Sequence, residues 1–438
     1  MNLFIKLIIK PLRSLLKLLF NRIFYVALAL VVQLAWLLIA LFRIMEYSRW
    51  VTIGMQAIGF LVVLWIVNKK INPSYKLAWT MLILIFPVFG VSLYLLFGKS
   101  RIGTVMEQHY QNLIAETAEY LEVSELTRKR LNEDDRSMRI QSDYIWQYSR
   151  YPVHENTTAE YFQVGDDMFP VLVHELEQAK HFIFMEYHAI ENADAWEKIQ
   201  DVLIDRVKAG VEVRVFYDDI GSISFLNHDF TRQLEALGIA CRVFNPFVPG
   251  VNLFLNNRDH RKITVIDGKV GFTGGYNLAN EYFGFSHPYG EWKDTGIRLE
   301  GDAVRSLTIT FLEMWNAIKK SLPSDRSFEP YLTEYQYKSV QHGYVQPYAD
   351  SPLDDEQVGE EVYISMANKA EHYCWFITPY LILTDEMSHA LSLAAKRDVD
   401  VRIITPGIPD KKMVYSVTRS FYHQLVSNGV RIFEWTPG

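Results

Sequence analysis

Residues 256–282, NNRDHRKITVIDGKVGFTGGYNLANEY, contain the side chains best suited to chemistry in this sequence. His260, Lys262 and Asp267 follow one another with the spacing H-x-K-x4-D. Residues 262–267 alternate as strand residues do, and in a strand every second side chain points to the same face. The spacing therefore predicts that the imidazole of His260 and the ammonium of Lys262 lie side by side.

This pair suits displacement at a phosphodiester. A neutral imidazole is nucleophilic near pH 7 and can attack phosphorus to form a covalent phosphohistidine. Lys262 and the amide of Asn277, with the backbone at Gly274 and Gly275, would hold the non-bridging phosphate oxygens while negative charge builds on them. The scheme requires neither a metal ion nor a cofactor.

Two carboxylates are candidates for supporting roles. An imidazole becomes positive as it attacks, and an acidic side chain beside its second ring nitrogen is the usual means of stabilising it. Asp294 is our candidate for that partner. Asp267 falls on the strand face opposite His260, so we expect it to steady the loop rather than react, although it stays among the candidate catalytic residues.

The elements that must position these residues begin near residue 156, where short apolar runs alternate with longer amphipathic stretches. This rhythm predicts an α/β domain whose helices cover a mostly buried sheet. The predicted strands are residues 181–187, 211–217 and 240–244, and the predicted helices are residues 171–179, 196–208 and 230–237.

The same order of segments recurs closer to the C-terminal end. The matching pairs are 179–190 with 370–382, 208–219 with 396–407, and 234–246 with 425–437. Only two copies are present, which favours two similar halves around a shared axis over a solenoid. An active site could then lie between the halves.

The motif resembles the HKD signature of the phospholipase D superfamily, whose usual ending is G-S-x-N. Gly275 replaces the serine, as in the first motif of bacterial cardiolipin synthases. Segments 75–98, 291–304 and 377–382 (ITPYLI) resemble other parts of that family in the same order. The resemblance implies a phospholipase D-like bilobal α/β/α sandwich, with an incomplete second lobe, after an N-terminal helical membrane domain.

The family resemblance also implies a reaction and a role for each matched residue. Two phosphatidylglycerol molecules would be joined into cardiolipin with release of glycerol. His260 would be the nucleophile, Lys262 and Asn277 phosphate ligands, and Asp294 the carboxylate partner of His260. Asp267 in that family is more often structural than reactive.

The second half departs from the family pattern. Members of the family need a second motif, because its histidine protonates the leaving alcohol and then deprotonates the attacking one. His260 lies 22 residues after Gly238, whereas the matching Gly429 lies nine residues before Gly438, and neither His389 nor His423 precedes a suitable lysine. A fragment, an inactive relative and a form that borrows a histidine from another subunit are the open explanations, and we expect this chain to lack turnover.

The N-terminal hundred residues predict contact with a membrane. Residues 1–22 intersperse basic and apolar side chains, as amphipathic helices on anionic lipid surfaces do. Ile23–Phe42 is long enough to span a bilayer, Val51–Val67 is shorter but sufficient, and Leu77–Phe97 contains Pro87 and Gly90, which favours a re-entrant turn. The positive-inside rule places the N-terminus in the cytoplasm of a bacterial cell. Two spans would keep the catalytic part of this multi-pass membrane protein in the cytoplasm, as we expect, and three would export it.

The amino-acid composition limits the other classes of function that the protein could have. Of 438 residues, 49% are hydrophobic, 22% are charged and the net charge is −7, which disfavours a nuclease that holds a phosphate backbone. Cys241 and Cys374 form neither a disulfide pattern nor a zinc motif. A membrane phospholipase D that hydrolyses phospholipids and a non-catalytic lipid-binding protein stay as alternatives, and the oligomeric state is open.

These observations predict six consecutive parts. They are a basic membrane-surface segment (1–22), a transmembrane or re-entrant anchor (23–100), a charged and solvated helical connector (101–155), a first phospholipase D-like lobe (156–325), a linker (326–345) and a second lobe that stops before its motif (346–438).

Overall fold

The computed structural model describes residues 31, 34–36, 38–39, 49–69, 73–98, 104–227, 229–246, 258–318, 328–332, 336–351, 353 and 356–438. They form two compact units, each described here by itself. The smaller unit comprises Met1–Thr104, Asp219–Ser224 and Asn245–Arg258, and the larger unit comprises Val105–Asp218, Phe225–Phe244 and Asp259–Gly438.

The smaller unit contains three consecutive apolar helices, α3 (Arg49–Val67), α4 (Pro73–Ile85) and α5 (Pro87–Phe97), and the short α11 (Asp219–Ser222). The apolar run that the sequence predicted to break does so at Phe86, because proline cannot continue the ladder of helical hydrogen bonds. Gly90 lets α5 approach α4 closely, since an added Cβ would overlap the backbone of Ile83.

Among the described residues, none of the helices combines the length and apolar character needed to cross a membrane. The span predicted at Val51–Val67 is therefore not found. Residues 1–22 lie outside the described part of the chain, and so does most of Ile23–Phe42.

The segment predicted to be a charged connector is helical. It forms α6 (Thr104–Thr117), η1 (Ala118–Tyr120), α7 (Glu125–Asp134) and α8 (Arg136–Ser149). One face of α6 is buried: Thr117 donates a hydrogen bond to Glu313, and His109 Nε2 lies 3.2 Å from the carbonyl of Asn316. These contacts attach α6 to the helix beneath the main sheet.

The first half of the larger unit is built on a seven-stranded mixed sheet in the order β1-β7-β6-β5-β2-β3-β4. Strands β2, β3 and β4 are parallel, and β5, β6, β7 and β1 continue the sheet with antiparallel pairs. The strands are β1 (Thr157–Phe162), β2 (Phe182–Tyr187), β3 (Glu212–Asp218), β4 (Ala240–Phe244), β5 (Lys262–Ile266), β6 (Val270–Gly274) and β7 (Gly296–Gly301). The predicted strands correspond to β2, β3 and β4.

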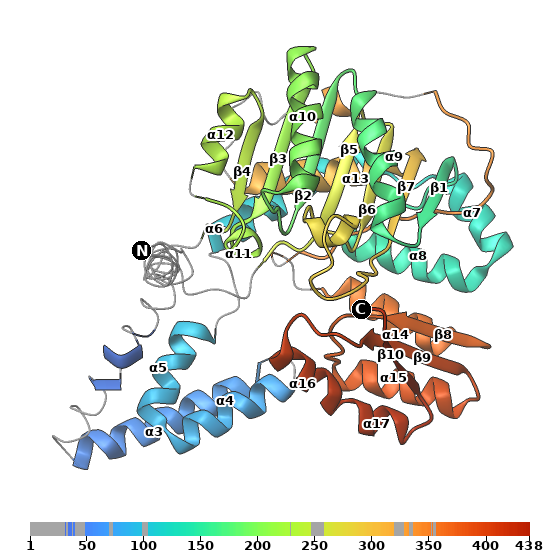
Figure 1. The fold of residues 1–438 in the computed structure, drawn as a ribbon. Coiled ribbons are helices and arrows are strands. Elements are labelled where there is room, and N and C mark those ends of the chain that lie inside the picture. Colours follow the sequence, from blue (N-terminus) through green and yellow to red (C-terminus); the bar gives the residue numbers. More distant parts are fainter. Residues whose placement is uncertain are drawn as a thin grey trace, which may run out of the picture. The chain divides into compact units, whose positions relative to one another are not determined.

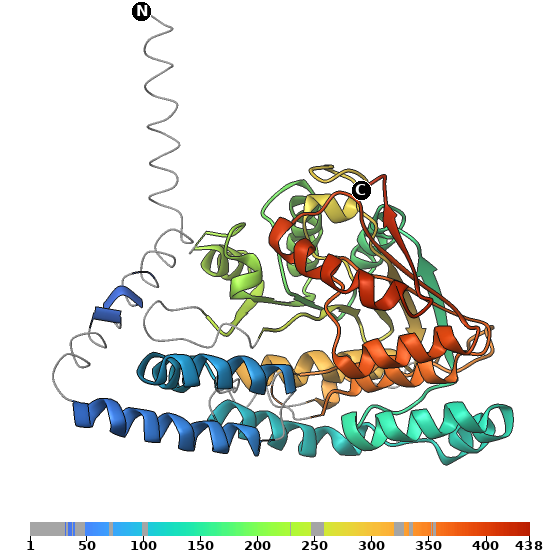
Figure 2. The same cartoon turned by 90° about the horizontal axis from the view of Figure 1, so that it is seen from below.

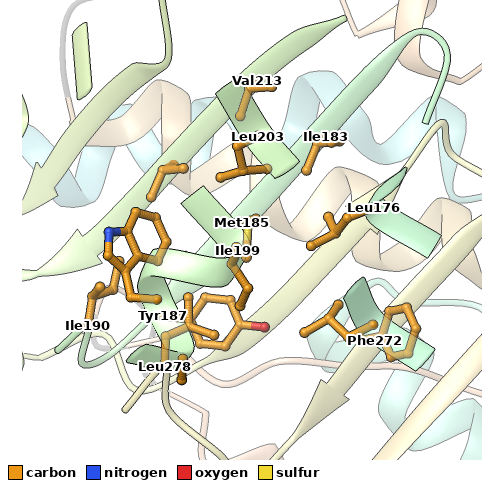
Figure 3. Close-up of a cluster of buried hydrophobic side chains, with 14 of the residues drawn as sticks. Leu176, Ile183, Met185, Tyr187, Ile190, Ile199, Leu203, Val213, Phe272 and Leu278 are labelled. Atoms are coloured by element: carbon orange, nitrogen blue, oxygen red, sulfur yellow. The ribbon is translucent and has the colours of Figure 1, made fainter. Parts of the chain in front are cut away.

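Helices cover both faces of this sheet (Figure 1). One face packs against α9 (Gly165–Glu177), α10 (Asp194–Lys208) and α12 (Phe230–Ala236), which correspond to the three predicted helices. Figure 3 shows Ile199 and Leu203 of α10 meeting Met185 and Tyr187 of β2 in this layer. Each such buried side chain contributes roughly 1.5–3 kcal/mol, against about 0–1 kcal/mol for an exposed ion pair, so apolar packing holds the layer.

The opposite face packs against α13 (Val304–Ile318), which is almost entirely buried. The ring of Phe311 stacks on Phe184 of β2 with 4.7 Å between centroids. Side chains of β2 point alternately to the two faces of the sheet, so neighbouring residues pack against different layers of helices. Because both faces are covered, all residues of β2 are buried. The chain continues through η4 (Glu329–Tyr331) toward the second half.

The second half has a parallel three-stranded sheet in the order β10-β9-β8. Its elements are α14 (Val358–Lys369), β8 (Tyr373–Ile377), α15 (Asp385–Lys396), β9 (Asp400–Pro406), α16 (Lys412–Ser420), α17 (Tyr422–Val426) and β10 (Arg431–Trp435). The repeated segments thus form equivalent parallel triplets, β2-β3-β4 and β8-β9-β10, as the sequence predicted.

The two triplets differ in how their faces are covered. Trp375 and Ile377 of β8 are exposed, whereas all of β2 is buried, and the described residues of the second half hold no counterpart of α13. The C-terminal residues lie beside the loop that precedes β7 (Figures 1 and 2), where the amide of Glu291 donates to the carbonyl of Pro437 over 2.8 Å. The halves are therefore in direct contact.

Asp267 ties the β5–β6 turn to the start of β2. Its carboxylate accepts backbone N–H bonds from Lys180, His181 and Phe182 at 2.8, 2.7 and 2.9 Å. The residue itself has a φ of 53°, a conformation that asparagine and aspartate tolerate better than most residues. These bonds replace the ladder partners that the first residues of β2 would otherwise lack.

We predict that Asp267→Ala lowers the stability of the larger unit by about 3 kcal/mol, because three charge-assisted hydrogen bonds are lost. Thermal unfolding should show a clear decrease in the melting temperature. Asp201→Ala, at an exposed position of α10, is the matched control and should leave that temperature nearly unchanged. Equal melting temperatures for the two variants would refute the structural role of Asp267.

Candidate active site

The motif occupies the β5–β6 hairpin and the turns at one end of it. Lys262 begins β5, and Gly274 ends β6. Because the two strands are antiparallel and Ile263 pairs with Thr273, the start of β5 and the end of β6 meet at the same sheet edge. The hairpin therefore brings His260 and Lys262 near the G-G-Y-N string, as the sequence predicted.

His260 and Lys262 lie side by side. The Nζ of Lys262 is 3.1 Å from Nδ1 of His260 and donates to the His260 carbonyl over 2.6 Å. Arg261, between them, turns to the α13 face, where its Nε lies 2.7 Å from Glu186 Oε1 and 2.9 Å from Asp259 Oδ1. Strand alternation thus separates the pair of His260 and Lys262 from a buried ion cluster.

The environment of His260 favours a neutral imidazole. Desolvation lowers its pKa to about 3, and the charge of Lys262 acts in the same direction. His188 and Lys411 lower the pKa of His260 further. His260 nevertheless keeps exposed surface.

Lys262 is a buried ammonium that is close to losing its proton. Desolvation lowers its pKa to about 8, while the carboxylates of Asp259, Asp294 and Asp218 oppose that shift. An anion placed beside Lys262 would favour its charged form. The site is therefore electrostatically prepared for a negatively charged group.

Asn277 is buried and held from both ends of its amide. Its Oδ1 accepts the backbone N–H of Ala189 over 3.1 Å, and its Nδ2 donates to Tyr282 Oη over 3.0 Å. These bonds fix the direction of the side chain next to the pair. Tyr282 also stacks near Trp292, with 5.0 Å between ring centroids.

Asp294 lies close to Lys262 and to Gly275. Trp292 Nε1 donates to its Oδ2 over 3.3 Å, and burial raises its pKa although Trp292 and Lys262 oppose the shift. The ammonium of Lys262 lies beside His260, and its charge also acts on the carboxylate of Asp294. The direct pairing of Asp294 with His260 stays a prediction.

Gly275 is the position where the motif departs from the usual serine. A Cβ added there would overlap the Oδ1 of Asp294. The carboxylate of Asp294 thus uses the space that a serine side chain would need. Gly274 ends β6 at the pair Gly274–Gly296, directly beneath this contact.

Asp267 is the candidate that the structure does not bring to the site. It follows the C-terminal end of β5, whereas His260 precedes the N-terminal end of that strand. Its carboxylate is engaged with the backbone at residues 180–182. Residues 263–266 lie between Asp267 and Lys262, and a catalytic role for Asp267 stays a prediction.

Several residues near the site were missed by sequence reasoning. The ring of His188 lies 4.6 Å from that of His260, and Tyr282 and Trp292 surround Asn277 and Asp294. From the second half, Tyr380 donates to Asp410 over 2.5 Å, next to Lys411. His188, Tyr282, Trp292 and Tyr380 all lie in segments that the sequence had singled out, but no motif assigned them a role. The contact of His188 with His260 spans 72 residues and leaves no local pattern.

The described residues contain no group of three or more histidine, cysteine, aspartate or glutamate side chains arranged to hold a metal ion. Cys241 and Cys374 are buried free thiols. Independence from a metal stays a prediction.

The chain can now be compared with known proteins. A family profile described as cardiolipin synthase, PLD-like domain matches residues 172–295 and 363–437, and a phospholipase D-nuclease N-terminal profile matches residues 57–99. A cardiolipin synthase of Halalkalibacterium halodurans is 30% identical, over 90% of this chain and 77% of that protein. The chain belongs to the phospholipase D-like cardiolipin synthase family. The resemblance and the phospholipase D-like fold class inferred from sequence are confirmed.

Other similar proteins extend the cardiolipin synthase comparison. Cardiolipin synthase 2 of Bacillus cereus is 32% identical, covering 87% of this chain and 73% of that protein. An uncharacterised protein of Streptococcus mutans is 41% identical, covering 86% of this chain and 81% of that protein. Among solved structures, phosphatidylserine synthase of Haemophilus influenzae has a TM-score of 0.44 and 16% identity over 64% of this chain and 72% of that chain.

We predict that Gly275→Ser displaces the Asp294 carboxylate and slows phosphodiester attack by His260 at least tenfold, a loss of about 1.4 kcal/mol or more. A double-mutant cycle with Asp294→Asn measures the coupling. In the Asp294→Asn background the serine should cost much less. Additive losses in the cycle would contradict the proposed contact.

Proposed function

We propose that this chain transfers the phosphatidyl group of one phosphatidylglycerol molecule to the headgroup of a second, giving cardiolipin and glycerol. The observation that carries the proposal is a neutral imidazole at His260 next to the buried ammonium of Lys262, with Nζ and Nδ1 3.1 Å apart. Family membership supplies the lipid context. The names of the relatives support cardiolipin synthesis over other phosphodiester chemistry.

The reaction proceeds in two displacements at phosphorus. A ring nitrogen of His260 forms a bond to phosphorus while the bond to the glycerol oxygen breaks, and that oxygen takes a proton from water. The primary hydroxyl of the second phosphatidylglycerol then attacks, the P–N bond breaks and the hydroxyl proton returns to the hydroxide left by the first step. Lys262 and Asn277 would hold the non-bridging oxygens in both steps.

The exposed apolar surface of the smaller unit is consistent with a substrate that lies in a membrane. Leu64, Trp65, Leu84 and Phe86 are exposed on or beside α3 and α4. Large exposed apolar patches are energetically unfavourable in water and mark sites of membrane or protein contact. We propose that these helices attach the enzyme to the bilayer surface, with the catalytic part in the bacterial cytoplasm.

Hydrolysis is the nearest alternative outcome, because water can replace the second alcohol without any change at His260. A membrane-bound lipid-binding protein without catalysis is the other. The net charge of −7 argues against a nuclease. Analysis of the lipid products distinguishes transfer from hydrolysis. A substitution at His260 distinguishes both reactions from lipid binding without catalysis.

We predict that the 438-residue chain, mixed with phosphatidylglycerol vesicles and quenched rapidly, carries a phosphatidyl group on His260 that mass spectrometry detects. The adduct should be absent in His260→Gln and present in His342→Gln, a variant of an exposed histidine in the same unit. Cardiolipin as product supports the transferase, phosphatidic acid indicates hydrolysis, and no adduct refutes the proposal. The same experiment tests the expectation from the sequence that this chain lacks turnover, since a labelled His260 without cardiolipin would support that expectation.

We predict a distinctive pH dependence for adduct formation. The lowered pKa of His260, about 3, keeps the imidazole neutral through pH 5, so protonation of His260 should not slow the reaction there. The lowered pKa of Lys262, about 8, means that the phosphate-binding charge is present below that pH and lost as pH rises through it. The rate should fall above about pH 8, and a rate that decreases instead near pH 6.5, the value of an ordinary histidine, would contradict this assignment.

A further inference from the structure

His188 lies outside the motif yet touches its nucleophile. It follows β2 directly, 72 residues before His260 in the sequence, and the two rings are 4.6 Å apart between centroids at an interplanar angle of 50°. His188 is mostly buried, with 20% of its side chain exposed. Its position makes it part of the wall against which His260 rests.

The hydrogen bond of His188 defines its tautomer. Nδ1 lies 2.7 Å from the carbonyl oxygen of Asp259. A carbonyl oxygen can only accept, so Nδ1 carries the proton and donates. The acceptor belongs to the peptide that joins Asp259 to His260, and His188 therefore holds the backbone at the point where the nucleophile begins.

A second group holds the preceding peptide. The amide of Asp259 donates to Asp218 Oδ2 at the end of β3 over 3.1 Å, and Asp218 Oδ1 is 4.0 Å from Nδ1 of His188. Asp259 is thus held on its amide side by β3 and on its carbonyl side by β2. The titratable groups that face His188 are Asp218 from β3 and Asp259 and His260 from the segment before β5.

The end of β2 holds other site residues in the same way. Tyr187 pairs with Lys262 across the sheet, and the backbone N–H of Ala189 donates to Asn277. His188, between these two residues, completes the set with its bond to Asp259. Three consecutive residues thus orient the nucleophile, the cation and the amide of the candidate site.

We propose that His188 is a positioning residue for phosphatidyl transfer, and that its Nδ1–H bond to the Asp259 carbonyl sets the position of the His260 imidazole for attack. The proposal rests on the proposed function of His260. It assigns the effect to a hydrogen bond at one ring nitrogen, not to proton transfer by the ring.

Three substitutions of His188 distinguish a hydrogen bond at Nδ1 from a role of the imidazole ring itself. His188→Asn places an N–H donor near the position of Nδ1, His188→Gln places its donor near Nε2, and His188→Phe keeps a ring without any donor. The rate of His260 labelling by bis(4-nitrophenyl) phosphate is measured under single-turnover conditions from pH 5 to 9, with the release of nitrophenol as the signal. Dissociation constants for the phosphodiester are measured alongside.

We expect His188→Asn to stay within about threefold of the wild-type labelling rate, and His188→Gln and His188→Phe to be at least tenfold slower, with similar affinity for the phosphodiester. The pH profile should keep its shape in all three. Wild-type labelling in His188→Phe would overturn the proposal, and so would a His188→Asn variant as slow as His188→Phe, because the imidazole itself would then be required.

Two further measurements keep the test decisive. If His188→Phe does not fold, as judged by circular dichroism, the contrast between the Asn and Gln variants decides. If even the wild-type chain is not labelled, the proposed function fails, and positioning is read from the ¹⁵N resonances of the His260 ring. These should be unchanged in His188→Asn and altered in His188→Gln, and equal resonances in both variants would overturn the positioning role.

Discussion

The buried ion cluster of Arg261 with Glu186 and Asp259 is the constraint on which the candidate site depends. All three side chains are nearly excluded from solvent, and removing one partner of such a cluster costs about 3–5 kcal/mol because a charge is left unpaired. Arg261 must therefore remain on the α13 face. Strand alternation then forces its neighbours His260 and Lys262 to the other face, and a register slip of one residue would exchange these environments.

Chain topology explains why residues from so many segments meet at one place. The C-terminal ends of parallel β2 and β3, the start of antiparallel β5 and the end of β6 share one edge of the sheet. In sheets of this kind ligands bind beyond the carboxyl ends of the strands. The second half adds Lys411, which follows β9 and whose charge lowers the pKa of His260. The repeat thus gives both halves an equivalent edge to contribute.

The periodicity of side chains along the sequence predicted those features of the structure that depend on neighbouring residues. Periodicity predicted the strands and helices of residues 171–244 and the repeat. It also predicted that His260 and Lys262 lie side by side and that Asp267 lies apart from this pair. Periodicity carries no information on the partners of Arg261 or on the contact of His188 with Asp259, since these join residues far apart in the sequence. An apolar run is also ambiguous by itself, since it does not show where a helix ends: the run 77–97 is divided between α4 and α5 at Phe86.

The electrostatics of Lys262 indicate why an anion should be preferred at this edge. Burial disfavours its ammonium, and three surrounding carboxylates compensate only in part, because its pKa is still lowered to about 8. A phosphodiester would add a negative charge next to Nζ and restore the preference for the charged form. A neutral ligand would leave the desolvation cost uncompensated. The same burial that disfavours the Lys262 ammonium therefore strengthens its attraction for a phosphate, and Asn277 adds a fixed dipole without adding charge.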